Sequence, residues 1–180
     1  MFRFLSLLWL MGAMVAPSNA RLPADKITSE EYSVYSSLIN SRFLSPQTNL
    51  ALIEGRTQFD DHMVTIPKEF ENDLQPKIAA NYALQRRLHI RVTYRLLTPA
   101  QLDALFKSDL REAWDIYWKR YPRATGLLTF SRVGFNATKT RAFVYVADVC
   151  GALCGYGRTF VLEKQNRAWK IVDERQLWIS

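Results

Sequence analysis

Every proline of this chain lies at or before Pro122, and this distribution constrains the fold more than any other feature. Proline has no N–H to donate to a β-ladder, so a long proline-free region is able to supply interior strands. Five of the seven glycines lie between Gly126 and Gly157, where they separate four runs of strand-forming residues. We predict strands over residues 126–133, 140–149, 155–164 and 169–178. Their short connections favour a four-stranded antiparallel meander.

The N-terminal half carries a helix signal near its start. Thr28 and Glu31 stand at the spacing of a capping box, and apolar residues then recur at helical intervals. A helix over residues 29–43 is therefore predicted. Residues 50–57 and 89–97 have the apolar content or the alternation of further short strands.

A second helix signal begins at Thr98, which precedes Pro99 and stands three residues before Gln101. Threonine caps such a start, proline suits the first helical position and glutamine completes a capping box. The helix is predicted to reach Tyr121, with a break near Ser108. Its aromatic stripe fits a sugar-stacking platform or a core face, and we favour the core. The stripe consists of Trp114, Tyr117, Trp118 and Tyr121.

These signals together predict an α+β fold. We expect one domain over residues 29–180, in which N-terminal helices pack on the C-terminal meander. Residues 21–28 then form a short N-terminal tail.

The two cysteines fall in one of the predicted hairpins. When Cys150 is placed opposite Cys154, the flanking strands make three favourable cross-strand pairs. We expect a structural disulfide, because an exported protein reaches an oxidising compartment. The alternative is a redox-active pair, although such pairs usually have two intervening residues at a helix N-terminus. The predicted pairs are Val144 with Phe160, Ala142 with Leu162 and Arg141 with Glu163, and the same register sets Asp148 beside Tyr156.

The first twenty residues have the pattern of a secretory signal peptide. Arg3 precedes an apolar run over residues 4–16, Pro17 interrupts it, and small residues precede a predicted cleavage point after Ala20. The apolar run is shorter than the ~20 residues that a membrane-spanning helix needs, which argues against an anchor. No later segment has the pattern of a transmembrane helix. We therefore expect a secreted or periplasmic protein.

The composition is that of a globular protein, with 48% hydrophobic and 23% charged residues. The formal charge is +7, and removal of residues 1–20 lowers it to +6 because Arg3 is their only charged residue. A positive charge favours an anionic envelope component as the binding partner. The alternatives are that the partner is another protein or that the protein has no anionic partner. Only Arg86-Arg87 and Lys119-Arg120 are adjacent basic pairs. Since no RNA-binding aromatic signature accompanies them, we expect no nucleic-acid partner.

The sequence contains neither of two common catalytic motifs. The chain lacks a Gly-x-Ser-x-Gly elbow and a His-Glu-x-x-His pair. One cluster has metal-ligand chemistry, but we interpret it as a surface loop and expect neither a metal nor a cofactor. It consists of Asp60, Asp61, His62 and His89.

Asp148 is the strongest catalytic candidate, with Tyr156 beside it. Asp148 shares a strand face with Val144 and Val146, which we expect to point at the helices. A carboxylate on an apolar face has a raised pKa and can act as a general base. The alternative places Asp148 at the rim of the sheet, bonded to Tyr156 or paired with Arg158.

The C-terminal third also contains a series of aromatic, glycine and cysteine motifs: Tyr117–Pro122, Gly126, Ser131–Asn136, Val144–Val146, Cys150-Gly151, Leu153–Gly155, Gly157, Trp169-Lys170 and Trp178–Ser180. This set resembles a family of small, uncharacterised secreted bacterial proteins. The resemblance implies an exported bacterial protein and supplies no catalytic residue. The closing Trp-Lys-Ile-Val…Trp pattern is also similar to the last strand of ketosteroid-isomerase-like folds, which implies a curved sheet.

Two classes of function remain. The first is a non-catalytic binding or interaction protein of the bacterial envelope. The second is a small-molecule enzyme or carrier with a pocket between helix and sheet, lined by Asp148, Tyr145 or Tyr156. A closed helix–sheet interface favours the first class, and a deep pocket favours the second.

Overall fold

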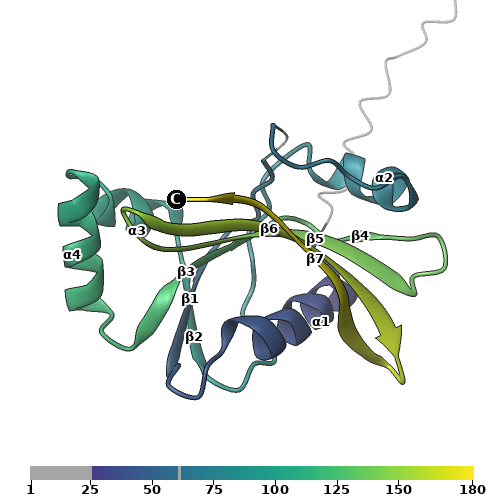
Figure 1. Ribbon diagram of the computed structural model, residues 1–180, viewed down its shortest axis with the longest axis horizontal. Helices are drawn as coiled ribbons and strands as arrows, with labels where there is room; N and C mark the ends of the chain where they lie inside the picture. The colour runs from purple at the N-terminus through teal and green to yellow at the C-terminus, as the bar shows by residue number, and fades with distance from the viewer. Residues whose placement is uncertain (1–25, 61) are drawn as a thin grey trace, which may run out of the picture.

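The proline-free C-terminal region forms the long strands of a sheet in a computed structural model of the protein (Figure 1). The structure describes residues 26–60 and 62–180, so the predicted signal peptide and the cleavage point after Ala20 lie outside the described residues. The strands of this region are β3 (Ala124–Phe130), β4 (Gly134–Phe135), β5 (Arg141–Gly151), β6 (Cys154–Gln165) and β7 (Ala168–Ile179). β3, β5, β6 and β7 pair antiparallel in chain order, and β4 also pairs with β5.

Two further strands extend the sheet beyond β3: β1 (Leu50–Glu54) and β2 (Thr93–Leu97). β1 pairs in parallel with both β3 and β2, which gives the order β2-β1-β3-β5-β6-β7. The expected four-stranded antiparallel meander is therefore wrong, because the sheet formed by the described residues has seven strands and is mixed. β1 is buried from Ala51 to Glu54. Such continuous burial is typical of a parallel strand that is covered on both faces.

The first predicted helix covers one face of the sheet. α1 (Ser29–Leu38) continues into a π-helical turn, η1 (Ile39–Phe43), and the capping box between Thr28 and Glu31 is confirmed. Ile27 is buried in the same core, so packing begins within the segment that we expected to be a tail. This core includes Tyr35, Leu38, Val144, Val146 and Phe160.

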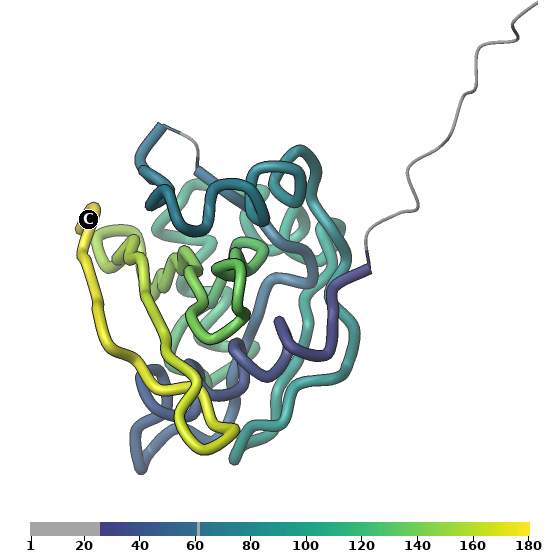
Figure 2. Tube along the Cα trace, turned by 90° about the vertical axis from the view of Figure 1, so that its right-hand side faces the viewer, coloured from purple at the N-terminus to yellow at the C-terminus, as the bar shows by residue number. Residues whose placement is uncertain are grey.

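A second helical segment covers the opposite face of the sheet (Figures 1 and 2). It consists of α2 (Lys68–Leu74) and the short helix η2 (Gln75–Lys77). Successive residues of a strand point to opposite faces, so Val144 packs on the α1 side and Tyr145 on the α2 side. The α2 core also includes Phe70, Leu74, Phe143 and Val161.

The second predicted helix is split in two at one end of the sheet (Figure 1). α3 (Pro99–Leu105) and α4 (Leu110–Arg120) confirm the break near Ser108. Three of the four rings in the predicted aromatic stripe are core, since they pack against leucines of β1, β2 and β3, and Trp118 is partly buried beside them. These rings are Trp114, Tyr117 and Tyr121. Within the described part of the chain, no helix has both the length and the apolarity to cross a membrane.

Candidate functional site

Asp148 lies near the end of β5, on the α1 side of the sheet. Its neighbour on β6 is Tyr156, which confirms the predicted register. Burial raises the pKa of the Asp148 carboxyl, although the positive charges of Arg158 and Arg42 act in the opposite direction. Arg158 pairs with Glu174 instead, at 3.3 Å. Among the described residues, none gives the Asp148 carboxylate a hydrogen bond, and Arg158 acts on it through its charge. The role of Asp148 therefore stays a prediction.

The structure does not bring Asp148 and Tyr145 together. The Tyr145 hydroxyl lies on the α2 side, where it accepts a 3.2 Å hydrogen bond from Trp178 Nε1. The Tyr156 ring lies beneath the guanidinium of Arg158, whose central carbon is 4.5 Å from the ring centre. The main surface cavities of the described residues are lined by other side chains. The geometry therefore does not favour a catalytic pocket formed by the three predicted residues.

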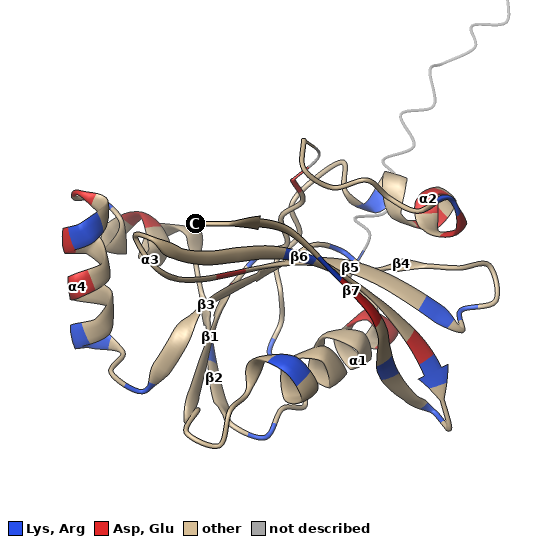
Figure 3. Cartoon of the chain, viewed as in Figure 1, with Lys and Arg blue, Asp and Glu red and all other residues tan. Residues whose placement is uncertain are grey.

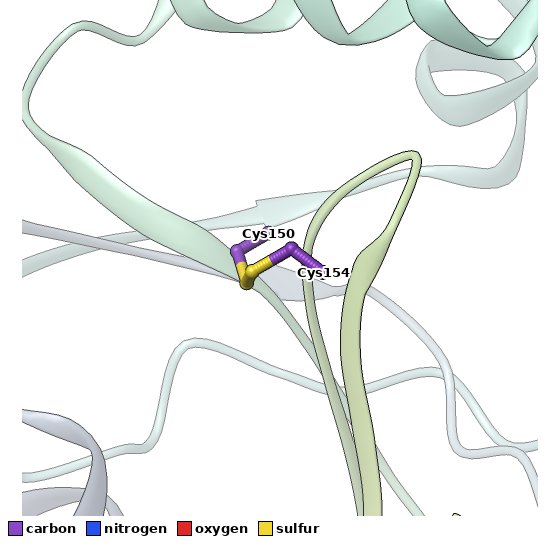
Figure 4. The surroundings of a disulfide bond; sticks show 2 residues. All are labelled: Cys150 and Cys154. Carbon is purple, nitrogen blue, oxygen red and sulfur yellow. A yellow bond between two sulfur atoms is a disulfide. The ribbon is translucent and has the colours of Figure 1, made fainter. Parts of the chain in front are cut away.

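Cys150 and Cys154 form a disulfide across the hairpin between β5 and β6 (Figure 4). Their Cα atoms are 5.0 Å apart. Cys154 lies opposite Gly151 rather than Cys150, because a bulge after Val149 displaces Cys150 from the ladder. A position in a strand hairpin, rather than at the start of a helix, favours a structural role. The predicted pairs Val144–Phe160, Ala142–Leu162 and Arg141–Glu163 are all confirmed.

The residues with metal-ligand chemistry are dispersed. Asp60 and His62 lie in the loop before α2, and Asp61 lies outside the described residues. His89 lies beside α1, on the other side of the sheet. Within residues 26–60 and 62–180, no group of three or more His, Cys, Asp or Glu side chains is arranged to hold a metal ion.

A groove runs along α1, between this helix and the segment that leads into β2. Its volume is about 280 Å³. A second cavity of about 150 Å³ adjoins it, since Tyr32 and Arg87 line both, and extends to Lys26 and Gln85. We call the two cavities together the α1 groove. The main cavity is lined by Ser29, Tyr32, Ser33, Ser36, Ser37 and Asn40 from the helical side, and by Arg87 and His89 from the facing segment.

Hydrogen bonds join the two walls of the α1 groove. Ser36 Oγ donates to the Tyr32 carbonyl at 2.6 Å and accepts from the His89 N–H at 3.0 Å. Asn40 Nδ2 donates to the His89 carbonyl at 3.0 Å, and Asn40 Oδ1 accepts from the Arg91 N–H at 2.9 Å. These bonds tie the segment to the helix, so the groove has fixed walls.

Arg87 stands where the two cavities meet. Its Nη2 donates to Ser29 Oγ at 2.7 Å, and its guanidinium carbon is 5.2 Å from the centre of the Tyr32 ring. The cation–π contact and the hydrogen bond orient the guanidinium. The side chains of Ser33, Ser37 and His89 make no hydrogen bond with a described residue. Their polar groups are therefore available to a ligand.

The α1 groove lies on an acid-free face. The sequence has no Asp or Glu over residues 32–53 or over residues 78–102, which are the segments that form this face. The chain beside α1 that leads into β2 accordingly shows basic residues and no acidic ones (Figure 3). The nearby Glu30 bonds to Lys164 and Trp169, and Glu31 is buried against Arg132. Lys26 precedes these two segments, and Arg86, Arg87 and Arg91 lie in the second of them; none of these four cations pairs with a described carboxylate. Of the other cations in the two segments, Arg42 pairs with Glu174 and Arg95 lies on β2.

No family model matches the chain, and the comparisons with curated proteins and with solved structures also found no match. The resemblance to small secreted bacterial proteins and the ketosteroid-isomerase-like curvature therefore stay predictions. The functional assignment depends on the geometry of this chain alone.

Arg86-Arg87 and His89 stand out in the sequence, but nothing near them in the chain connects them with the first helix. A signal was present, because two long acid-free segments both carry basic or hydroxyl side chains. Ser29, Ser33 and Ser37 also recur every four residues, which places them on one side of a helix. The contact between the two segments joins residues about fifty positions apart, such as Ser36 and His89, and only the fold shows it.

Proposed function

We propose that the protein is a non-catalytic binding protein of the bacterial envelope, secreted or periplasmic, that holds an anionic envelope component at the α1 groove. The observation that carries this proposal is the cluster of Lys26, Arg86, Arg87 and Arg91 on an acid-free face. No described carboxylate neutralises these four cations, so their field acts on solutes that approach the groove.

The other adjacent basic pair of the chain has different surroundings. Lys119 and Arg120 lie on α4 together with Glu112 and Asp115. Acidic and basic side chains that alternate along a helix are typical of a solvated face. Basic residues beside α1 lack acidic neighbours, whereas those on α4 have them. This difference supports anion binding at the α1 groove rather than a general effect of the net charge.

The interior of the protein also favours binding over catalysis. Tyr35, Leu38 and Ile39 are completely buried between α1 and the sheet, and the cavities lie at the surface. The alternative function is a small-molecule enzyme or carrier, and the raised pKa of Asp148 is the observation that favours it. This carboxylate lines none of the main cavities, which makes the binding function the better supported of the two.

The proposal is tested by co-sedimentation of the protein with bacterial envelope fragments. The variant Arg87→Glu/Arg91→Glu should bind at least about tenfold more weakly than wild type, because it replaces attraction by repulsion at the groove. The matched control is Lys119→Glu/Arg123→Glu, which changes the net charge equally on another surface. An equal loss in both variants would show a response to net charge alone and would contradict the proposal. Binding should also weaken with added salt.

The expected compartment has its own test. If the signal peptide is removed after Ala20, the exported protein begins at Arg21, and N-terminal sequencing of the periplasmic or secreted fraction detects this end. Retention of residues 1–20 in that fraction would overturn the predicted cleavage. Recovery of the protein from the cytoplasm alone would overturn the envelope function.

A further inference from the structure

Each free polar group of the α1 groove can donate a hydrogen bond. Ser33 and Ser37 lie one helical turn apart on the helical wall, and Arg87 and His89 line the facing wall. Arg87 uses one of its N–H groups on Ser29, which leaves four for a ligand. No carboxylate lines either cavity. A ligand at this site meets hydroxyl and nitrogen donors together with fixed positive charge.

This donor set fits a tetrahedral oxyanion. A guanidinium binds phosphate oxygens through paired N–H groups, and hydroxyl donors complete such sites. A cationic ligand would need carboxylates, which the groove lacks. A neutral sugar that stacks would need an open aromatic face, but Tyr32 is only 3% exposed and Arg87 covers its ring.

The size of the groove indicates more than a bare ion. The main cavity of about 280 Å³ is several times the ~30 Å³ that one water molecule occupies. The adjoining cavity adds about 150 Å³ beyond Arg87, with Gln85 and Lys26 on its walls. A phosphate together with the polar alcohol that it esterifies fills such a space better than phosphate alone.

We propose that the α1 groove binds a phosphate ester, held by Arg87, by the hydroxyls of Ser33 and Ser37 and by the imidazole of His89. The inference rests on the proposed function, because it names the chemical class of the anionic envelope component. The ester can belong to the headgroup of an anionic phospholipid or to a soluble polyol phosphate, and both present the same phosphate to the groove.

The first experiment measures binding of the intact protein by calorimetry and by vesicle sedimentation. The soluble probe is sn-glycerol 3-phosphate, with glycerol as its uncharged control. The membrane probe is a vesicle of phosphatidylglycerol, with phosphatidylcholine vesicles as the neutral control. Saturable binding of glycerol phosphate without vesicle binding assigns a soluble ester. Binding to phosphatidylglycerol that free glycerol phosphate competes away assigns the lipid headgroup, and either result supports the inference.

The second experiment uses the variant Ser33→Ala/Ser37→Ala, which removes two hydroxyls and leaves the charge unchanged. Alanine is the best helix former, so the substitutions preserve α1. Phosphate-ester binding should fall at least about tenfold, since two hydrogen bonds to the charged phosphate oxygens are lost. The matched control is Ser41→Ala, one turn further along and outside the groove, which should bind as wild type does. Arg87→Gln should abolish saturable binding.

The outcomes separate this inference from the proposed function. If neither probe binds saturably, or if Ser33→Ala/Ser37→Ala binds like wild type, the phosphate-ester site is refuted. The proposed function survives that result if envelope fragments still bind and Arg87→Glu/Arg91→Glu still prevents it. If wild-type protein does not bind envelope fragments either, the proposed function fails as well.

Discussion

Glu31 and Arg132 form an ion pair inside the protein, although they lie 101 positions apart in the sequence. Arg132 Nε and Nη2 donate to the two carboxylate oxygens of Glu31 at 2.7 and 3.1 Å, and neither residue is more than 1% exposed. The same carboxylate accepts the N–H groups of Thr28 and Val133. Glu31 therefore caps its own helix and also fixes the start of α1 to the chain that follows β3.

Replacement of Glu31 by glutamine should lower the free energy of unfolding by roughly 3–5 kcal/mol, because the buried guanidinium of Arg132 then loses the charge of the Glu31 carboxylate. Urea unfolding at neutral pH measures the loss. The matched control is Arg42→Gln, which breaks a similarly bidentate pair with Glu174 on the surface. That variant should lose at most about 1 kcal/mol. Equal losses in the two variants would show that burial does not govern the strength of these pairs.

The same carboxylate should make the stability depend on pH. Burial opposes the ionisation of Glu31, but the hydrogen bonds from Arg132 and Thr28 and the charges of Arg132 and Lys77 outweigh it, so its pKa is lowered from 4.5. A lowered folded pKa gives stabilisation that is present above the unfolded pKa and is lost as pH falls through the folded pKa. Wild type should therefore lose stability on acidification more steeply than Glu31→Gln. Parallel curves of unfolding free energy against pH would contradict this assignment.

Asp148 should act in the opposite sense. Burial raises its pKa from 3.8 despite the positive charges of Arg158 and Arg42. Its stabilising contribution is thus present below the unfolded pKa and is lost as pH rises through the higher folded pKa. Asp148→Asn should raise the thermal midpoint at about pH 7 and leave it unchanged near pH 3, where both side chains are neutral. Asp103→Asn, on exposed α3 surface, is the control. Destabilisation by Asp148→Asn at pH 7 would reveal a favourable role for the charge.

The pairing of β5 with β6 could be predicted from the sequence because it depends on local information. A one-residue slip moves every apolar side chain of a strand to the other face, so the pattern around Val144 and Phe160 permits a single register. The bulge that sets Gly151 opposite Cys154 could not be predicted, since it changes only the last pair of the hairpin. The pattern of apolar residues along the two strands is the same with or without this bulge, so it does not predict the bulge.

The position of β1 and the contacts of Glu31 lay beyond sequence analysis for a different reason. A parallel strand reaches its neighbour through a long crossover, so the residues that pair with Leu52, which is opposite Leu127, are distant along the chain. The capping role of Glu31 follows from local sequence. Its pairing with Arg132 depends on the position of β3 in the sheet, because Arg132 follows that strand. The α1 groove also depends on contacts between residues that are distant in the sequence, because Ser36 meets His89 only in the folded chain.

Tyr117 offers a test of core packing. Its ring is fully buried beneath α4, burial raises the pKa of its hydroxyl, and that hydroxyl has no hydrogen-bond partner among the described residues. Tyr117→Phe should therefore be neutral or stabilising by up to about 1 kcal/mol, because it removes an unsatisfied polar group. Tyr117→Ala should cost roughly 3–5 kcal/mol, since it leaves a cavity.

The control for Tyr117→Phe is Tyr35→Phe. The Tyr35 hydroxyl donates to the Ser131 carbonyl at 2.7 Å in the core, so its removal leaves a buried acceptor unsatisfied and should cost roughly 1–3 kcal/mol. Both losses are measured by chemical unfolding. A large loss in Tyr117→Phe would indicate a hydrogen bond to water at this hydroxyl.

The disulfide should be dispensable for folding. Only three residues separate Cys150 from Cys154, and closing so short a loop removes little entropy from the unfolded chain. The ladder from Arg141–Glu163 to Val149–Gly155 already holds the hairpin together. Cys150→Ser/Cys154→Ser should therefore lower the free energy of unfolding by about 1–3 kcal/mol while it keeps the fold. Thiol titration of the unfolded wild-type protein without reductant should find no free thiol. If the double variant folds but loses binding to envelope fragments, the redox interpretation of the pair replaces the structural one, because neither cysteine lines the α1 groove and a purely structural bond then has no reason to affect that binding.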